Sequence, residues 1–232
     1  MNDSVSVVMT ARDAERFIVE ALRSALDQTV APDEIVVVDD GSSDATAALA
    51  GAIDPRVTVI QRRHSGIGPS RNAGLERAGG AFVALLDADD VWLPSKLALQ
   101  LAAFAADPSR EAVFTRFDEF VDPDDPPAGG TRAPLTEQSG ALPSGLLMRR
   151  TVVDRIGPLA AGSVGDWVSW WATARALGIH EYVVPEVLYR RRIHRTNNSL
   201  VSADGGREFV SVARRHLRDL GEHRSSRGSY LS

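Results

Sequence analysis

The chain has 232 residues, of which 44% are hydrophobic and 25% are charged, which suits one globular domain of α/β size. It contains no cysteine, which excludes disulfides and thiolate chemistry, and its net charge of −5 argues against nucleic acid as a partner. No apolar run approaches the roughly 20 residues of a membrane-spanning helix, and the first residues lack a signal-peptide pattern, so we expect a cytoplasmic protein.

The first half of the chain alternates between apolar, β-branched runs and segments with helical spacing. The runs predict strands at residues 5–10, 34–38, 57–60 and 81–86. The spacing predicts helices at residues 17–28, 45–50, 66–78 and 95–104. This alternation predicts an α/β fold with a mostly parallel central sheet flanked by helices.

The second half is less regular. Strands are expected at residues 113–121 and 182–189, and a helix is expected at 166–177. The segment 146–156 mixes apolar and basic residues and is expected to pack in the core. The Pro-, Gly- and Asp-rich stretch 122–134 is expected to be an exposed loop. The tryptophans of the 166–177 helix span nearly a full turn, so we expect most of them to pack in the core.

A basic amphipathic helix is predicted at residues 209–220, followed by a polar tail. Its apolar positions favour packing on the domain or a homodimer contact. The alternative is a peripheral contact with the inner face of a membrane.

Polar residues follow three of the predicted strands. They are Thr10, Ala11 and Arg12 after the first, Asp39 and Asp40 after the second, and Asp87, Ala88, Asp89 and Asp90 after the fourth. Ligands of open α/β sheets bind beyond the carboxyl ends of the strands. Helix capping explains one such aspartate more readily than the whole set. Clustered carboxylates suit a hard divalent cation, Mg²⁺ or Mn²⁺, which normally shares its coordination shell with phosphate oxygens.

Two common nucleotide-binding motifs are missing. The sequence has no G-x-x-x-x-G-K-[ST] loop, which excludes a P-loop NTPase. Gly66 and Gly68 lack the third glycine of a dinucleotide fingerprint and do not follow the first strand, which argues against a Rossmann dehydrogenase.

Four blocks, in order, carry a family resemblance: V-S-V-V-M-T-A-R, I-V-V-V-D-D-G-S-S-D, S-R-N-A-G-L-E-R-A and L-L-D-A-D-D-V-W-L-P. They resemble a family 2 glycosyltransferase with the GT-A fold, and the likeness covers about residues 5–200. The resemblance implies a nucleotide-diphosphate sugar donor, a divalent metal that bridges the diphosphate, and inversion at the anomeric carbon. It divides the single domain into a nucleotide-sugar half at 1–118 and an acceptor and catalytic half at 119–200, with the helix and tail at 201–232.

The resemblance also implies roles for residues of the donor side. Asp39 accepts a hydrogen bond from the base, and Asp87 faces the ribose and the metal, which Asp89 binds. The nucleotide pocket would be lined by Thr10, Ala11, Arg12, Ala88 and Arg71. For Arg71 the alternative is a position on the exposed surface of its helix, with no role in binding. Uracil, thymine and guanine all carry an N–H that suits Asp39, so UDP is the first choice and dTDP and GDP remain open.

The resemblance places the catalytic base at Asp166, where it would take a proton from the acceptor hydroxyl. Gly165 stands where the family usually has Glu, and the alternative role for Asp166 is to cap its helix. In Y-R-R-R-I-H-R, His194 would contact the metal or a phosphate, and Arg192 would offset diphosphate charge. The implied reaction is a single displacement.

Two other functions remain open at this point: a non-catalytic nucleotide-sugar-binding protein and a sugar nucleotidyltransferase. For the latter, T-A-R-D-A-E-R is a poor match to the usual Gly-rich signature. The acceptor is left open among a carbohydrate, a lipid-linked sugar and another hydroxyl compound, and residues 122–144 are expected to help select it.

Overall fold

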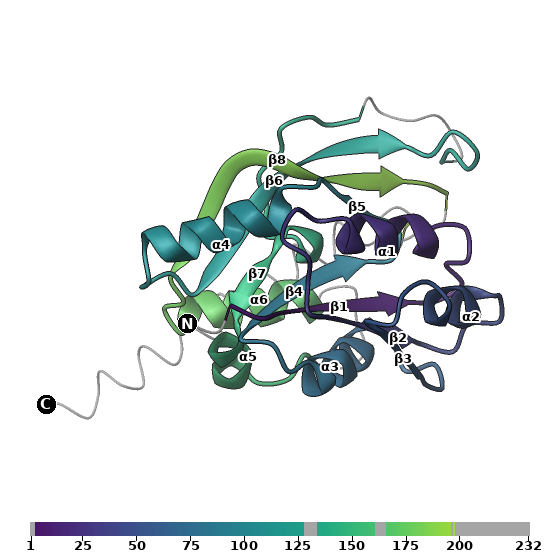
Figure 1. Ribbon diagram of the computed structural model, residues 1–232, viewed down its shortest axis with the longest axis horizontal. Coiled ribbons are helices and arrows are strands. Elements are labelled where there is room, and N and C mark those ends of the chain that lie inside the picture. Colours follow the sequence, from purple (N-terminus) through teal and green to yellow (C-terminus); the bar gives the residue numbers. More distant parts are fainter. Residues whose placement is uncertain (1–2, 128–133, 161–165, 196, 198–232) are drawn as a thin grey trace, which may run out of the picture.

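A mixed sheet with helices on both faces forms the centre of the protein (Figure 1). The structure is a computed structural model that describes residues 3–127, 134–160, 166–195 and 197. Within these ranges the sheet has eight strands in the order β3-β2-β1-β4-β7-β6-β8-β5. The strands β3, β2, β1 and β4 are mutually parallel, and β7 runs antiparallel to both of its neighbours, β4 and β6.

The first half confirms the expected alternation of strands and helices. Its elements are β1 (Val5–Ala11), α1 (Ile18–Leu26), β2 (Glu34–Asp39), α2 (Thr46–Gly51), β3 (Val57–Gln61), α3 (Ile67–Arg77) and β4 (Phe82–Asp87). In the parallel register Thr10 pairs with Asp87 and Ala11 pairs with Asp39. The polar groups predicted from three separate strand ends therefore share one edge of the sheet.

The second half contains β5 (Val91–Trp92), α4 (Lys96–Ala106), β6 (Ala112–Val121), a 3₁₀ turn η1 (Pro143–Gly145), β7 (Leu147–Arg149), α5 (Arg150–Ile156), α6 (Asp166–Ala176) and β8 (Glu181–Ile193). β8 extends beyond the predicted 182–189 and pairs with β6 in parallel. Their register shifts between Thr115 and Arg116, opposite Pro185, whose nitrogen cannot donate a ladder hydrogen bond.

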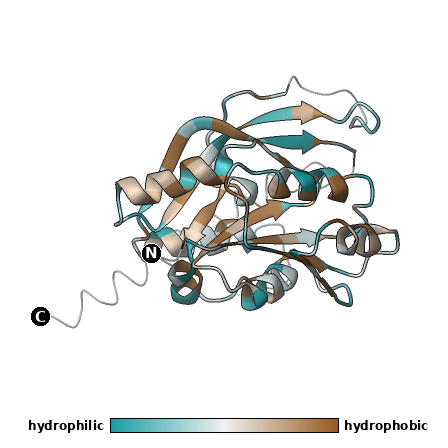
Figure 2. Ribbon diagram, viewed as in Figure 1, coloured by the Kyte–Doolittle hydropathy of each residue, from teal (hydrophilic) through white to brown (hydrophobic). Residues whose placement is uncertain are grey.

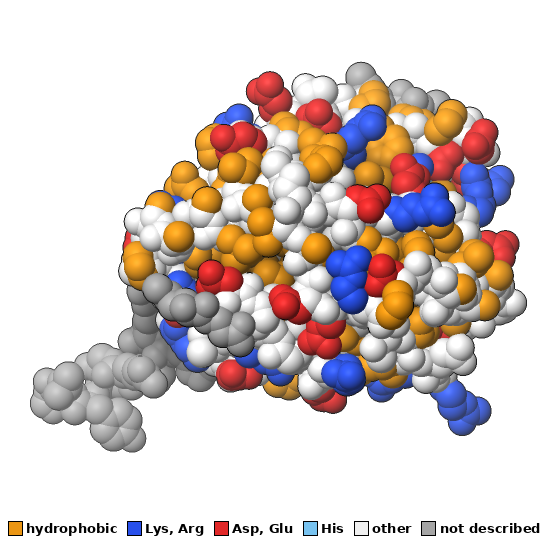
Figure 3. All heavy atoms as spheres, viewed as in Figure 1, with side chains coloured by type: hydrophobic (Ala, Val, Ile, Leu, Met, Phe, Trp, Pro, Cys, Tyr) orange, Lys and Arg blue, Asp and Glu red, His pale blue; other side chains and the backbone are white. Residues whose placement is uncertain are grey.

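Two hydrophobic layers cover the sheet, and alternate residues of β1 supply both. Val7 and Met9 point into one layer with α1, α2 and α4, while Val8 points into the other with α3, α5 and α6. Brown, hydrophobic strand segments run through the centre of the molecule in Figure 2. In contrast, on the face drawn in Figure 3 acidic and basic side chains are intermixed, and no large patch of one charge forms among the coloured atoms.

The three tryptophans of α6 confirm the core prediction. All three are buried, and their rings pack on one another with centroids 5.5 to 6.2 Å apart. Each indole N–H donates a hydrogen bond, which removes the cost of burying it: Trp167 to the carbonyl of Ala141, Trp170 to that of Gly157, and Trp171 to Glu181.

The prediction that residues 122–134 form an exposed loop is partly wrong. Asp122 and Asp125 are buried, because arginines from distant elements pair with both: Arg16 lies 3.2 Å from Asp125, and Arg192 lies 3.3 Å from Asp122. Residues 128–133, Gly165 and the predicted helix at 209–220 lie outside the described residues. No helix among the described residues is long and apolar enough to span a membrane.

Lys96, the chain's single lysine, is fully buried at the start of α4. Its Nζ donates a hydrogen bond to Gln100 at 2.9 Å and lies 4.0 Å from the centre of the Trp92 ring. Burial lowers the pKa of Lys96 in the folded protein well below its ordinary value, which the unfolded chain retains. At a pH between the folded and the unfolded pKa, the unfolded chain therefore binds one proton more than the folded protein at this residue. We therefore expect the free energy of unfolding to rise with pH through that window.

Denaturant unfolding measured from pH 7 to 9.5 checks this expectation, with Lys96→Met as the comparison. The variant should lose the part of the rise that comes from Lys96, because it lacks that amine. A wild-type profile parallel to that of the variant would contradict the assignment.

Candidate active site

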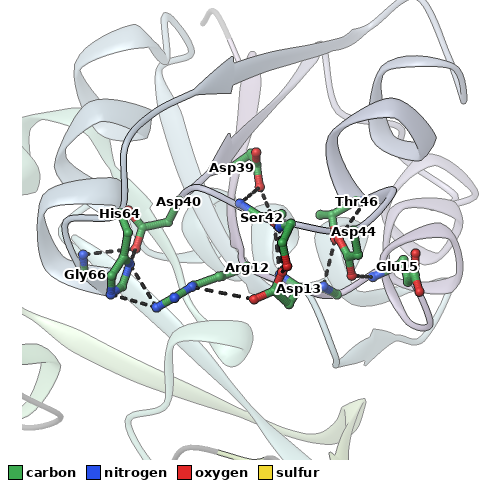
Figure 4. A network of polar contacts seen from close by, with 12 residues as sticks. Arg12, Asp13, Glu15, Asp39, Asp40, Ser42, Asp44, Thr46, His64 and Gly66 are labelled. Atoms are coloured by element: carbon green, nitrogen blue, oxygen red, sulfur yellow. Dashed lines mark hydrogen bonds and ion pairs between the residues drawn. The ribbon is translucent and has the colours of Figure 1, made fainter.

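One end of the candidate site lies where the loops after β1, β2 and β3 meet (Figure 4). Asp40 accepts hydrogen bonds from the backbone of Ser65 at 2.8 Å and Gly66 at 3.0 Å, and from His64 Nδ1 at 2.8 Å. Burial alone would raise the pKa of Asp40, but these bonds, that of Ser65 foremost, outweigh it and lower the pKa. Gly66 has φ of 97°, a conformation that favours glycine. Arg12 Nη1 lies 2.7 Å from His64 Nε2, which brings the predicted arginine onto this loop.

Asp39 is buried beside this group. Its Oδ1 accepts hydrogen bonds from both the backbone and the hydroxyl of Ser42, as Figure 4 shows. Among the described residues Oδ2 has no hydrogen-bond partner, so it can accept one from a ligand. Asp39 therefore offers one carboxylate oxygen that is available to a hydrogen-bond donor.

A second set of contacts fastens the β1–α1 loop to the β2–α2 loop. Asp13 adopts φ of 47° and accepts from the backbone of Ser43 at 2.8 Å, while its own N–H donates to Ser42 Oγ at 3.0 Å. Glu15 and Asp44 exchange similar bonds with the opposite backbone at 3.0 and 3.1 Å. These reciprocal bonds fix the position of Ser42 and, through it, the Asp39 carboxylate.

Asp87, at the end of β4, is paired with Arg71 from α3. Arg71 Nη2 lies 2.7 Å from Asp87 Oδ1, and the guanidinium carbon lies 5.8 Å from the centre of the Trp167 ring. Arg71 is only 5% exposed, so a surface arginine is the wrong description. Arg71 thus links the turn of residues 87–90 that follows β4, the acid turn, to Trp167 in the first turn of α6.

Asp89 lies against the end of β8. Its Oδ2 is 3.0 Å from His194 Nε2 and accepts a hydrogen bond from the amide of Asn197 at 3.2 Å. The ring of His194 is buried and lies 4.6 Å from that of Phe17. The fold thus brings together an acid and an imidazole that are 105 residues apart in the sequence.

Asp90 is buried and holds the turn that follows β4. Its N–H donates to the carbonyl of Asp87 at 3.1 Å, and its carboxylate accepts from Ser144 Oγ at 2.6 Å and Arg192 N at 3.1 Å. Burial first, and then the charges of Asp89 and Asp87, raise the pKa of Asp90 well above its ordinary value. Ala88 is buried within the same turn.

Arg192 is also buried, and its guanidinium already contacts three protein groups. Nε donates to the carbonyl of Asp89 at 3.0 Å, Nη1 to Asp122 at 3.3 Å, and Nη2 to Glu20. The group also lies 4.6 Å from the ring centre of Phe120. In this arrangement Arg192 holds β8 against the acid turn.

Asp166 is buried at the start of α6, beside the first turn of α3. A Cβ placed on Gly68 would lie 2.8 Å from Asp166 Oδ2 and would overlap the carbonyl of Ala160. Gly68 therefore permits the close approach of Asp166 to α3. The next residue, Trp167, lies against the guanidinium of Arg71. The predicted base is therefore adjacent in sequence to a residue that contacts the Arg71–Asp87 pair.

Several groups that shape this site were not predicted from the sequence. Ser144, Asn197 and Glu20 contact the acid turn or Arg192, and no motif marks Ser144 or Glu20. Asn197 had a visible signal, because N-N-S matches a glycosylation sequon, but that signal points to other chemistry. Their roles depend on contacts between distant parts of the chain.

The donor set at Asp89 and His194 suits a metal held jointly with a ligand. No group of three acidic, histidine or cysteine side chains among the described residues could enclose a metal by itself. Mg²⁺ characteristically takes one or two carboxylates, and completes its shell with substrate phosphates and water. The carboxylate and imidazole present therefore fit Mg²⁺ or Mn²⁺ in a diphosphate complex.

The fold matches that of a solved GT-A glycosyltransferase. The crystal structure of S. aureus TarS 1-349 in complex with UDP-GlcNAc superposes with a TM-score of 0.72 at 20% sequence identity, and the match covers 92% of this chain and 65% of that one. The protein is thus a single α/β domain of the GT-A type, as predicted. The model of the family Glycosyl transferase family 2 matches residues 6–156, and the chain belongs to this family.

Curated relatives agree with this assignment. The chain is 30% identical over 230 residues to the uncharacterized glycosyltransferase alr2836 of Nostoc, which covers 88% of this chain and 69% of the relative. It is 47% identical over 95 residues to the succinoglycan biosynthesis protein ExoO of Rhizobium meliloti, covering 40% of this chain and 27% of the relative. It is 37% identical over 100 residues to the Escherichia coli protein WfgD, named UDP-Glc:alpha-D-GlcNAc-diphosphoundecaprenol beta-1,3-glucosyltransferase, covering 42% and 40%. The matched regions thus span well under half the length of ExoO and WfgD.

Proposed function

We propose that this chain is an inverting glycosyltransferase that moves a sugar from a nucleotide-diphosphate donor to an acceptor hydroxyl in a metal-assisted single displacement. The observation that carries the proposal is the meeting of Asp89 and His194, 3.0 Å apart, at the sheet edge that also bears Asp39. A base-binding carboxylate and a metal-binding pair on one edge match the two ends of a nucleoside diphosphate. Family membership supports the same reading.

UDP is the donor nucleotide that we favour. Asp39 Oδ2 suits the N3–H of uracil, and TarS, which shares the fold, has been solved with UDP and with UDP-GlcNAc. dTDP and GDP remain alternatives, because thymine and guanine also present an N–H. For the acceptor we propose a hydroxyl of a lipid-linked sugar or another carbohydrate, in line with the acceptor in the name of WfgD.

Asp89 and His194 would hold the divalent cation. When bound, Mg²⁺ or Mn²⁺ would stabilise negative charge on the departing diphosphate. The protein supplies the orientation: Asn197 and the His194 ring fix Asp89 Oδ2, and Arg192 fixes the backbone of Asp89. Arg71 holds Asp87 in place, and its guanidinium would add positive charge beside a bound diphosphate.

Asp166 would act as the general base. The acceptor oxygen forms a bond to the anomeric carbon as the bond from that carbon to the diphosphate oxygen breaks, and the acceptor proton passes to Asp166. Attack from the face opposite the nucleotide inverts the anomeric carbon. The burial of Asp166 against α3 restricts its position, which favours a precise approach to one hydroxyl.

Thermal and denaturant unfolding with UDP, GDP, dTDP and CMP, each with and without Mn²⁺, tests the proposal. At 100 times its Kd, a ligand adds about 2.7 kcal/mol to the free energy of unfolding. We expect one diphosphate to stabilise the protein much more with Mn²⁺ than without it, and Mn²⁺ alone to have little effect, since the described residues offer an incomplete coordination shell.

The same panel also identifies the base, because only the matching nucleotide should respond. Stabilisation by Mn²⁺ alone would mean that the protein has a complete metal site of its own. Absence of stabilisation by every nucleotide would refute the proposed donor site.

A further inference from the structure

Ser144 in η1 is the centre of a small hydrogen-bonded group next to the acid turn, which we call the hub. Its hydroxyl accepts the N–H of Asp87 at 3.1 Å and donates to Asp90 Oδ2 at 2.6 Å. Its carbonyl accepts the indole N–H of Trp92 at 2.8 Å. Ser144 is 1% exposed, so these bonds are made away from water, where an unpaired group is costly.

The hub reaches both ends of the turn. Asp87 begins the turn and Asp90 ends it, so one hydroxyl bonds to the two residues that flank Ala88 and Asp89. Such a bridge limits how far the turn can open or rotate. The Ser144 hydroxyl thereby restricts the orientation of the Asp87 and Asp89 side chains.

Asp90 extends the hub to β8. Its Oδ1 accepts the backbone N–H of Arg192, two residues before His194. The same carboxylate therefore joins Ser144 to the strand that carries the partner of Asp89. A shift of the Ser144 hydroxyl would be passed to both sides of the Asp89–His194 pair.

We propose that Ser144 is a positioning residue for the metal-diphosphate site: by bridging Asp87 and Asp90 it sets the conformation of the acid turn and the spacing of Asp89 from His194. This inference rests on the proposed function. It assigns a role to η1, which lies outside the four sequence blocks that carry the family resemblance.

A hydroxyl is the group that this position requires. It can accept one hydrogen bond and donate another at the same time, which matches the Asp87 N–H and the Asp90 carboxylate. Alanine would leave both groups buried without that partner. The turn would then relax toward conformations that satisfy them differently, and the metal-binding geometry would be lost in most of these.

The test compares Ser144→Ala with Thr115→Val. Thr115 is also buried and packs beside Gly145, the neighbour of Ser144, but its Oγ1 has no hydrogen-bond partner among the described residues. Calorimetry should give the Kd of UDP with and without Mn²⁺, using the diphosphate identified by the stability panel if that is not UDP. We expect Ser144→Ala to lose at least about tenfold in the affinity with Mn²⁺ and little in the affinity without it. Thr115→Val should stay within about twofold in both.

A merely structural serine would lower the unfolding midpoint without changing this metal-dependent difference in affinity. Folded Ser144→Ala protein with wild-type affinity in the presence of Mn²⁺ would therefore overturn the inference while leaving the proposed function intact. If the alanine variant does not fold, Ser144→Cys, a near-isosteric change to a weaker hydrogen-bonding group, should still lose several-fold, and wild-type affinity in that variant would overturn it equally. Failure of the wild type to bind any diphosphate would instead refute the proposed function, and this inference with it.

Discussion

Asp166→Asn is expected to reduce the turnover number by about 10²- to 10⁴-fold, the range typical for the loss of a general base. Donor binding should change little, because the Asp166 carboxylate lies against the first turn of α3 at Gly68. Asparagine keeps the shape of the side chain, so Gly68 and the chain at Ala160 should stay in place. The measurement is kcat and KM for the donor, together with the Kd of the nucleotide and Mn²⁺.

The fold should survive this substitution with a small loss of stability. An acid in the first turn of a helix contributes roughly 0.3–1 kcal/mol through the helix dipole, and the neutral amide loses this term. Asp154→Asn is the matched control: it removes an acid from the neighbouring helix α5, where the side chain is 65% exposed. It should retain wild-type kcat.

Two results would contradict the assignment of Asp166. Unchanged kcat in Asp166→Asn would place the base on another residue. Parallel loss of donor affinity and turnover would mean that Asp166 serves the donor site. Wild-type protein that binds the donor but neither transfers nor hydrolyses it would favour a nucleotide-sugar-binding protein without catalytic activity.

The sheet edge of the first half was predictable because it follows from local patterns. Apolar runs mark parallel strands, parallel strands end at one edge, and the residues that follow each run must therefore lie together. The pairing of Thr10 with Asp87 and Ala11 with Asp39 is the direct result. No knowledge of side-chain contacts was needed to place these groups.

The partners of those groups were less predictable, because each depends on a distant segment. Ser144 meets Asp87 and Asp90 only because η1 precedes β7, which pairs antiparallel with β4. Nothing in P-S-G indicates this contact. The same holds for Glu20, which reaches Arg192 across 172 positions of sequence.

Composition misled the prediction at residues 122–134. Proline, glycine and aspartate are typical of exposed loops, yet Asp122 and Asp125 are buried. Their charges are offset by Arg16, Arg192 and Arg195, which come from other elements. Buried acids in such a segment are recognisable only when the arginines that pair with them are known.

Asp89→Asn is expected to abolish the contribution of Mn²⁺ to nucleotide binding. The neutral amide is a poor ligand for a hard divalent cation, so the affinity for UDP with Mn²⁺ should fall to the affinity for UDP alone. Base recognition by Asp39 is separate and should persist. Calorimetric titration of the wild type and the variant, with Mn²⁺ and with chelator, gives both quantities.

The unliganded Asp89→Asn protein should be at least as stable as the wild type. Burial first, and then the charges of Asp89 and Asp87 in the same turn, raise the pKa of Asp90, so these like charges repel one another. Removing one charge relieves this repulsion, while the side-chain amide introduced by the substitution can still accept a hydrogen bond from His194 or Asn197.

The acid turn would thus give up stability in the free protein for the ability to bind a metal-diphosphate, a trade-off common at functional sites. Denaturant unfolding of both proteins at pH 7 without ligand checks this expectation. A clear loss of stability in the variant, with metal-dependent binding retained, would show instead that Asp89 serves the fold through His194 and that the cation binds elsewhere.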